Sequence, residues 1–311
     1  VLANRNTAIR ARIERALQEL GIPFSVRPST DYQISSAALT SLLSATCGKT
    51  AAGKRLPDFW PRLSNRSLGT LLRGYFDGDG TVGKNGEVTA TTASEDLASD
   101  LAYALKRFGI HARLRKIWKR ATNSRHAGGM YNCVAVSGLD DLQRYAQAIG
   151  FDHPDKHARL EALCRRKGDT NVDVVPILPG DLKIIRLGMG LRQKDVARLA
   201  DCSRAMISFV ESGRRRPSRV LLARLLDGLA VTARGTEVPD IAWWNRLRAL
   251  RGLCSSRWAR IRSVERIQYD HPYVYDLSVP GPETFLAGRG GVFVHNTFSI
   301  ANVIQKIQRT T

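Results

Sequence analysis

Residues 71–82, LLRGYFDGDGTV, are the stretch that decides the fold of the first half of this sequence. The stretch combines an apolar start with several glycines and two carboxylates, Asp77 and Asp79. Taken alone, the Asp-Gly-Asp-Gly run is as consistent with a turn or a calcium-like loop as with a catalytic segment. The sequence on either side of it therefore has to decide between these alternatives.

Outside this stretch, the first half of the chain repeats one order of elements. Apolar residues recur at helical spacing over residues 8–20 and again over residues 97–108. Each helix is expected to end at a glycine, Gly21 in the first copy and Gly109 in the second. Strands are expected around residues 24–26 in the first copy, and around residues 112–118 and 131–136 in the second. We therefore predict two degenerate copies of one α/β unit, the first of which is cut short at its front.

These features together resemble the LAGLIDADG, or DOD-type, homing endonucleases over residues 1–168. In that family, two helices of this kind pack face to face through their small residues, here Gly74 and Gly78. The resemblance implies a domain of α/β LAGLIDADG repeats that cuts double-stranded DNA. Because the first of the two helices would precede Val1, this sequence is expected to hold half of the catalytic pair.

The same resemblance assigns roles to four side chains. In the family each helix delivers one Asp to the scissile phosphates, so Asp79 is the expected catalytic residue and the ligand of Mg²⁺. Asp77, near the helix end, is expected to be structural. Lys54 and Lys156 match the lysines that help to organise the attacking water in the family, although a solvated surface lysine is an alternative for Lys156.

Residues 193–211, QKDVARLADCSRAMISFVE, have a bipartite pattern of two short helices joined by a turn. The turn is expected at Asp201, because Asp tolerates a left-handed backbone better than most residues. The side chains expected to form the small core between the helices are Val196, Ala200, Cys202, Ile207 and Val210. The pattern resembles the Cro/C1-type helix-turn-helix and predicts an all-α module over residues 181–230.

In such modules, the start of the second helix enters the major groove of DNA, and the first helix meets the phosphate backbone. The resemblance therefore makes Gln193 a candidate phosphate anchor. The candidate base-reading residues are Ser203, Arg204, Ala205 and Ser208. Residues 181–230 carry 11 Lys or Arg against 5 Asp or Glu, and this excess of positive charge suits the role. A helical packing module without DNA contact is the alternative.

The C-terminal region contains VYDLSV at residues 274–279, TFLAG at 284–288 and GVFVHNT at 291–297. These phrases resemble the last two conserved blocks of inteins, and they imply an all-β, Hint-type C-terminal splicing half over residues 263–296. A helical connector over 231–262 would join it to the helix-turn-helix.

The residue types at this junction suit autocatalytic protein splicing. Asn296 can attack its own peptide carbonyl, and His295 can donate a proton or polarise that carbonyl. Thr297 supplies the hydroxyl that first takes the acyl group of the upstream flank. Asp276 matches the acidic residue that assists these steps in the family, and splicing needs no cofactor.

Residues 297–311 would then belong to the host protein, or extein. The run TFSIANVI at residues 297–304 resembles the segment that directly follows the P-loop in the B subunit of excinuclease ABC. This short resemblance makes that protein the expected host.

Composition agrees with a DNA partner. The chain has 311 residues and a formal net charge of +20, and a polyanion is the partner that such a charge favours. No apolar run approaches the roughly 18 residues of a membrane span. Five scattered cysteines, an odd number, point to a reducing cytoplasmic compartment and not to a disulfide framework.

Two functions remain open on the sequence. The first is an intein that combines splicing with a homing endonuclease. The alternative is a DNA-binding regulator with a Cro/C1 domain and a decayed endonuclease fold, which would bind DNA without cutting it.

Overall fold

The structure is a computed structural model that falls into two compact units, within residues 1–167 plus 269–311 and within residues 168–268. The described residues are 2–3, 6–27, 31–120, 128–166, 173–234, 240–259, 261, 263–266, 268, 270, 272–273, 277, 279–281 and 283–295, with the backbone alone for 2, 3 and 295. Among them, no helix is both long enough and apolar enough to cross a membrane.

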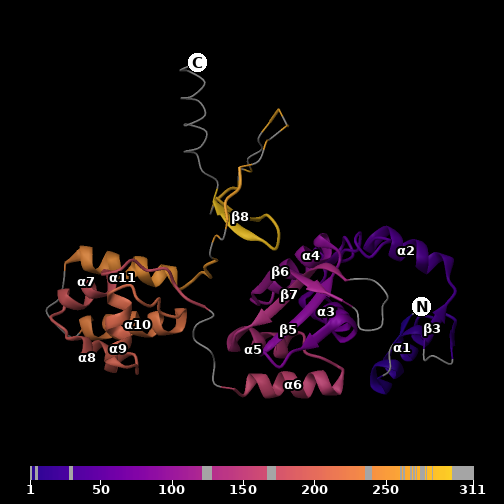
Figure 1. Cartoon of the computed structure of the whole chain (residues 1–311), viewed down its shortest axis with the longest axis horizontal. Coiled ribbons are helices and arrows are strands. Elements are labelled where there is room, and N and C mark those ends of the chain that lie inside the picture. The colour runs from indigo at the N-terminus through magenta and orange to yellow at the C-terminus, as the bar shows by residue number, and fades with distance from the viewer. Residues whose placement is uncertain are drawn as a thin grey trace. The chain divides into compact units, whose positions relative to one another are not determined.

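The first unit contains a four-stranded antiparallel sheet of order β4-β5-β7-β6, with helices grouped around it (Figure 1). Valine and threonine make up most of β5, and β7 contributes Val134 and Val136, as expected for β-branched residues on a pleated surface. The strands are β4 (Gly80–Val82), β5 (Glu87–Thr92), β6 (Ala112–Lys119) and β7 (Gly129–Ser137). The helices are α3 (Asn65–Asp79), α4 (Glu95–Lys106), α5 (Leu139–Ala148) and α6 (Pro154–Cys164), with a 3₁₀ turn, η1 (Trp60–Arg62), before them.

One face of this sheet packs against the helices. The fully buried side chains of the shared core include Leu72 and Phe76 from α3, Leu101 from α4, and Val88 and Val134 from the sheet. Serine side chains start both principal helices: the hydroxyl oxygens of Ser64 and Ser94 accept from the backbone N–H groups of Ser67 and Leu97, at 3.1 Å each. The expected helix over 97–108 and the expected strands around 112–118 and 131–136 are confirmed within two or three residues at each end.

The N-terminal segment of the same unit repeats the second half of this order. Its elements are β1 (Leu2–Ala3), α1 (Thr7–Glu19), β2 (Phe24–Val26), β3 (Asp31–Ile34) and α2 (Ala37–Cys47). The strand order β1-β3-β2 matches β5-β7-β6, and α1 and α2 take the places of α4 and α5.

The turns after α1 and α4 are also alike. Gly21 and Gly109 have φ angles of +63° and +68°, a left-handed region that favours glycine. In both turns an isoleucine N–H donates back to a leucine carbonyl, at 2.8 Å from Ile22 and 3.2 Å from Ile110. The sequence-based prediction of two related α/β units is therefore confirmed.

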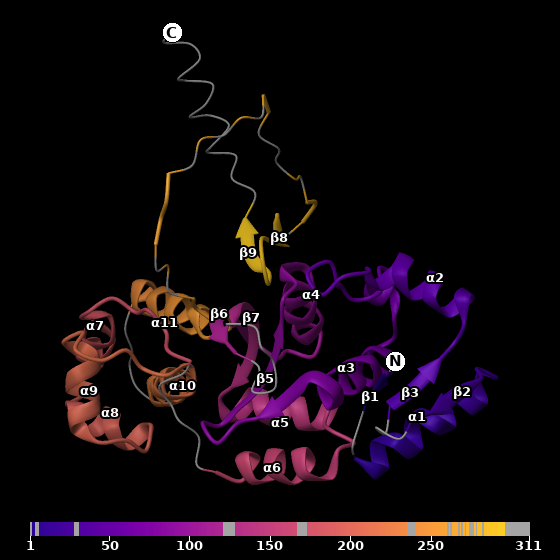
Figure 2. The ribbon, with the colours of Figure 1, turned by 45° about the vertical axis from the view of Figure 1, so that its right-hand side comes forward.

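In the described part of the second unit, five helices form a bundle with its own apolar core (Figure 2). They are α7 (Asp181–Gly188), α8 (Gln193–Leu199), α9 (Arg204–Glu211), α10 (Arg219–Arg234) and α11 (Ile241–Leu253). Residues 231–262 were expected to be a helical connector. The described part of this range contains the end of α10 and the helix α11. α11 packs into the core through Trp243, Leu247 and Leu250, and the Trp243 indole N–H donates to the Ile185 carbonyl at 2.9 Å. This apolar face makes α11 part of the bundle.

Within residues 263–296, the described part contains one antiparallel hairpin of β8 (Thr284–Ala287) and β9 (Val292–His295) (Figure 2). Its register places Thr284 opposite His295 and Ala287 opposite Val292. A hairpin of this kind is a component of an all-β region, and the complete Hint-type half stays a prediction.

Candidate catalytic and DNA-binding sites

The C-terminal end of α3 brings two of the predicted catalytic residues together. Asp79 is the last residue of this helix, and its side chain is exposed. Lys156 reaches the same helix end from α6, where its Nζ donates to the carbonyls of Phe76, at 3.1 Å, and Asp77, at 2.6 Å. Partial burial lowers the pKa of Lys156, while the carboxylates of Asp77 and Asp79 act in the opposite direction. Lys156 is therefore held at the helix end by its contacts and is not a solvated surface lysine.

Asp77 has the structural position that the sequence predicted. Its side chain is buried, and its carboxylate accepts the backbone N–H groups of Asp152 and His153 at 3.1–3.2 Å. These groups lie at the start of α6, where backbone donors lack partners within the helix. Asp77 thus ties α3 to α6, which in turn carries Lys156.

Lys54 takes a different position from Lys156. It is exposed, and its backbone carbonyl accepts the hydroxyl of Ser94 at the start of α4. The contacts of the structure thus tie Lys156 to the Asp79 end of α3 and Lys54 to α4. A catalytic role for Lys54 stays a prediction.

The glycine face of α3 is open in the part of the chain that the structure describes. Outside the helix's own backbone, nothing lies within 4 Å of the position that a Cβ atom would take at Gly74 or Gly78. Tyr75, on the same helix, has its pKa raised by burial and, less strongly, by the Asp79 carboxylate. The open glycines leave room for the close approach of another helix beside Asp79.

The oxygen donors at this helix end fit half of a metal site. Mg²⁺ prefers carboxylate oxygens and near-octahedral coordination, and Asp79 offers one exposed carboxylate. Within the described ranges, no group of three or more His, Cys, Asp or Glu residues is placed to hold an ion. A cation here would therefore need further oxygen ligands beside Asp79.

In the helical unit, the turn between α8 and α9 has the geometry that the sequence predicted. Asp201 has a φ angle of +48°, in the left-handed region. Val196, Ala200, Ile207 and Val210 are buried in the core. Cys202 packs against this core as a partly buried residue.

The predicted base readers lie at the start and along one side of α9. Arg204 and Ala205 are exposed and Ser208 is half-buried, whereas Ile207 and Val210 point into the core. The Ser203 hydroxyl oxygen accepts from the Met206 N–H at 3.2 Å and caps the helix. α9 therefore presents one arginine at its first turn, the part of a recognition helix that contacts base edges.

Gln193, the candidate phosphate anchor, is engaged inside the protein. Its Nε2 donates to Glu211 at 2.9 Å, and Glu211 also accepts two bonds from the Arg186 guanidinium at 2.6 and 3.0 Å. Burial alone would raise the pKa of Glu211, but Arg186 and Gln193 outweigh it and lower the pKa. The buried ion pair thus fixes Gln193 at the start of α8. Its contact with phosphate stays a prediction.

We expect Arg186→Ala to destabilise the helical unit by about 3–5 kcal/mol, because it leaves Glu211 buried without its charge partner. The control is Arg251→Ala, which breaks an ion pair with Asp227 whose side chains are 47% and 59% exposed and is expected to cost at most about 1 kcal/mol. Amide hydrogen exchange of α9 and α10 in the full chain measures both, since a chain of two units has no single unfolding transition.

The pH dependence gives a second test of the same pair. The pKa of Glu211 in the folded unit lies below the unfolded value of 4.5. The ionised Glu211 therefore contributes its full share to the stability of the helical unit above pH 4.5, and this share is lost as the pH falls through the folded pKa. Hydrogen exchange of α9 and α10 as a function of pH measures that loss. Equal protection of α9 and α10 from hydrogen exchange in Arg186→Ala and Arg251→Ala would contradict the assigned role of the buried pair Arg186–Glu211.

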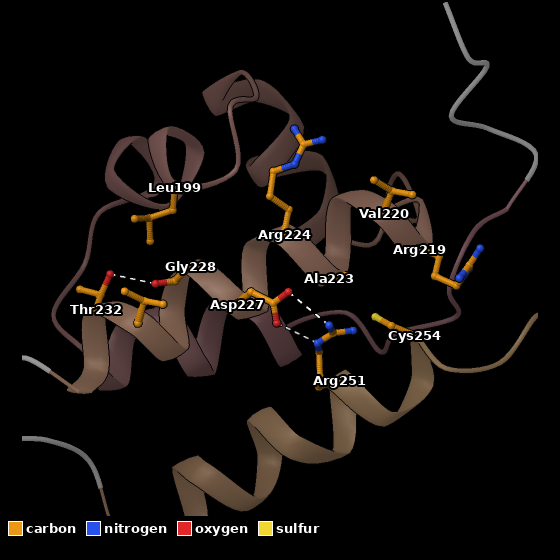
Figure 3. Close-up of a pocket in the computed structure, with 11 residues that line it drawn as sticks. Leu199, Arg219, Val220, Ala223, Arg224, Asp227, Gly228, Thr232, Arg251 and Cys254 are labelled. Atoms are coloured by element: carbon orange, nitrogen blue, oxygen red, sulfur yellow. Dashed lines mark hydrogen bonds and ion pairs between the residues drawn. The ribbon is translucent and has the colours of Figure 1, made fainter. Parts of the chain in front are cut away.

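A cavity of about 640 Å³ lies in the helical unit between the end of α8, α10 and α11 (Figure 3). Leu199 and Val220 are among the residues that line it, together with three arginines. All three are already engaged: Arg219 with Asp173, Arg224 with the Ala200 carbonyl and Arg251 with Asp227. None of the residues predicted to act on DNA lines this cavity.

The structure also places together a group that the sequence analysis missed. Arg113 and Arg115 of β6 lie on the sheet face opposite to the helices, where both contact Glu87 of β5. The signal that could have revealed the two arginines is the alternation of Arg113, Leu114 and Arg115, which puts both arginines on one face of a strand. Their shared contact with Glu87 depends on the strand order, which this alternation does not give.

The predicted splice-junction residues mostly lie outside the described residues. This holds for Asp276, Asn296 and Thr297, and of His295 the structure gives only the backbone at the end of β9. Their roles stay predictions.

Comparison with known proteins assigns two regions to families. Residues 68–150 match the LAGLIDADG-like domain and residues 157–239 match the helix-turn-helix domain. The first range begins in α3 and ends after α5; the second covers α7–α10.

The chain is also similar to parts of several larger curated proteins. It is 28% identical to elongation factor 2 of Methanopyrus kandleri, over 95% of this chain and 22% of the relative. It is 27% identical to the B subunit of the A-type ATP synthase of the same organism, over 78% of this chain and 22% of the relative. It is 29% identical to the replicative DNA helicase DnaB of a Synechocystis species, over 78% of this chain and 26% of the relative. The chain thus spans about a quarter or less of the length of these relatives.

The fold and the family matches together place a LAGLIDADG-like domain and a helix-turn-helix domain in one chain. These two domains indicate a DNA-binding, endonuclease-like protein.

Proposed function

We propose that this chain is part of an intein, a self-splicing element that also carries a site-specific DNA endonuclease. The observation that carries the proposal is the pattern of similarity. Most of this chain matches about a quarter or less of an elongation factor, a component of an ATP synthase and a DNA helicase, whose names have nothing in common. An element that inserts into different host proteins and removes itself accounts for such a shared segment.

The proposed splicing chemistry uses the C-terminal junction. The Thr297 hydroxyl first attacks the ester or thioester that joins the upstream flank to the Cys or Ser opening the N-terminal splicing half. That bond breaks, the Cys or Ser leaves with a proton, and the acyl group passes to Thr297 with help from Asp276. The side-chain amide nitrogen of Asn296 then attacks its own backbone carbonyl carbon, and the peptide bond to Thr297 breaks. Asn296 becomes a C-terminal succinimide, and the released nitrogen of Thr297 takes a proton that His295 can donate.

For DNA cleavage, Asp79 is the proposed ligand of a divalent cation such as Mg²⁺. The bound ion would supply charge stabilisation at the scissile phosphate and lower the pKa of a bound water. Lys156 is proposed to orient that water or a phosphate oxygen, and its contacts with the carbonyls of Phe76 and Asp77 at the end of α3 support this role. The open face at Gly74 and Gly78 accommodates a second helix of the same kind, from which a second carboxylate would come.

Two surfaces are proposed to bind double-stranded DNA: the exposed start of α9 and the outer face of the β4-β5-β7-β6 sheet. Their joint use would lengthen the DNA footprint and so raise site specificity. The net charge of +20 supports tight, salt-dependent binding to phosphates. The compartment is proposed to be the cytoplasm, and the flanking host to be the B subunit of excinuclease ABC.

We expect Arg204→Ala to weaken binding by about 1–3 kcal/mol on a duplex that the wild-type chain enriches from a random-sequence library, because a base contact in the major groove is lost. Arg248→Ala is the matched control: it removes the same charge from an exposed position on α11. It is expected to weaken binding only by its share of the salt-dependent attraction.

Titration of each variant against salt, on the enriched and on an unrelated duplex, separates these effects. Equal losses for Arg204→Ala and Arg248→Ala would contradict the groove assignment of α9. Specific binding without cleavage by the completed endonuclease in Mg²⁺ would favour a DNA-binding regulator.

A further inference from the structure

The outer face of the four-stranded sheet has an unusual distribution of side-chain sizes. Residues opposite each other in an antiparallel register point to the same face. Glu87 on β5 faces Ser137 on β7, and Arg113 on β6 faces Ala135 on β7. β7 lies between β5 and β6, and the side chains that it contributes to this face are all small: Cys133, Ala135 and Ser137. Long side chains from β6 can therefore lie across β7 and reach β5.

Arg113 and Arg115 of β6 both extend across β7 and contact the carboxylate of Glu87 on β5. Nη2 of Arg113 donates to Glu87 Oε1 at 2.6 Å, and Nη2 of Arg115 donates to Glu87 Oε2 at 2.6 Å. Asn85 Nδ2 donates to Glu87 Oε2 at 2.9 Å, and Arg113 Nη2 also donates to Ser137 Oγ at 2.9 Å. The carboxylate is thus surrounded by donors and orders both guanidinium groups.

The exposures of the three side chains differ sharply. Glu87 is 8% exposed, whereas Arg113 and Arg115 are 49% and 42% exposed. A guanidinium has five N–H donors, and the bonds that hold Arg113 within the described residues all start from Nη2. Arg115 donates to Glu87 from Nη2 and, at 3.5 Å, also from Nη1. Both arginines remain about half exposed while the acid that holds them is covered.

Ordered guanidinium groups on a sheet suit one kind of recognition. The major groove admits a two-stranded β-ribbon such as β6–β7, and arginine binds the O6 and N7 atoms of guanine with two hydrogen bonds. A free arginine carries about 2 kcal/mol of rotamer entropy, and prior ordering removes that cost from binding. Since both guanidinium groups share one carboxylate, they would address neighbouring base pairs.

We infer that Glu87 is a positioning residue that holds Arg113 and Arg115 as a preset pair for reading two neighbouring guanines in the major groove. The inference rests on the proposed function in one respect, that the LAGLIDADG-like domain binds duplex DNA. It adds the base preference and the residue that produces it.

The test uses the full chain and a random-sequence duplex library, with sequencing of the bound fraction. Wild type is expected to enrich guanine at two neighbouring positions. Arg113→Lys and Arg115→Lys keep the charge but lose the two-bond geometry, so each is expected to lose the enrichment at one of the two positions. These variants assign the guanine positions to the sheet and not to α9.

Glu87→Gln is the decisive variant, because the two effects of the change have opposite directions. Loss of a negative charge should strengthen binding to an unselected duplex. Loss of the positioning contact should lower guanine enrichment about tenfold, as expected when two flexible side chains must be ordered during binding. The control is Glu95→Gln, whose carboxylate is 55% exposed and pairs with Lys116 and Arg289. It makes the same charge change and should strengthen unselected binding without altering guanine enrichment.

Unchanged guanine enrichment in Glu87→Gln would overturn the inference, as would an equal loss in Glu95→Gln. Hydrogen exchange of β5 and β7 checks that the sheet of each variant is intact, and the two lysine variants test the inference independently if Glu87→Gln disturbs it. Absence of any duplex binding by the wild-type chain would instead overturn the proposed function.

Discussion

Asp79→Asn is expected to lower the rate of DNA cleavage by about 10³-fold or more and to leave DNA affinity within about twofold. Asp79 is exposed at the end of α3, so its carboxylate is free to hold a cation at the scissile phosphate. Asparagine keeps the size of the side chain but loses the charge that such a cation requires. Loss of several kcal/mol of transition-state stabilisation corresponds to a rate change of this order. The measurement is cleavage of an enriched duplex in Mg²⁺ by a chain completed with the first LAGLIDADG helix.

Asp77→Asn is the matched control, because it makes the same chemical change two residues away. Asp77 is buried and accepts backbone N–H groups of α6, so its replacement should reduce the protection of α6 from hydrogen exchange. Asp79→Asn should leave that protection unchanged. Cleavage at the wild-type rate by Asp79→Asn would show that the active site is elsewhere.

Asn296→Ala is expected to abolish cleavage of the peptide bond after residue 296. Alanine has no side-chain nitrogen that could form the succinimide, so the expected effect is complete and not partial. The assay mixes the chain with a matching N-terminal splicing half and follows release of the segment that begins at Thr297.

Thr297→Ala separates the two steps at this junction. It removes the acceptor hydroxyl and should prevent joining of the flanks, while Asn296 can still cyclise. Release of the segment from the Asn296→Ala chain would contradict the assignment of Asn296.

The local elements were largely predictable from sequence because their signals are local. Helical periodicity and a terminal glycine located α1 and α4, and the left-handed turn at Asp201 followed from its place between two short amphipathic segments. The structural role of Asp77 also followed from its position in the motif.

What the sequence did not reveal depends on partners distant along the chain. A solvated surface position remained an alternative for Lys156 on the sequence, because its contact with the end of α3 joins residues about eighty positions apart. The packing of α11 depends on an apolar face that is weakly patterned in sequence. The Glu87 cluster needs the strand order β5-β7-β6, which places β7 between the acid and its arginines. The sequence of a single strand does not determine which strands lie beside it in the sheet.

The central claim is that this chain is a splicing element, and the most direct measurement is the mass of its products. Wild-type chain mixed with its N-terminal splicing half should yield a fragment that ends at Asn296 as a succinimide, together with a joined product of the two flanks. Intact-mass spectrometry detects both. An intact bond between Asn296 and Thr297 after incubation with a folded N-terminal half would contradict the account.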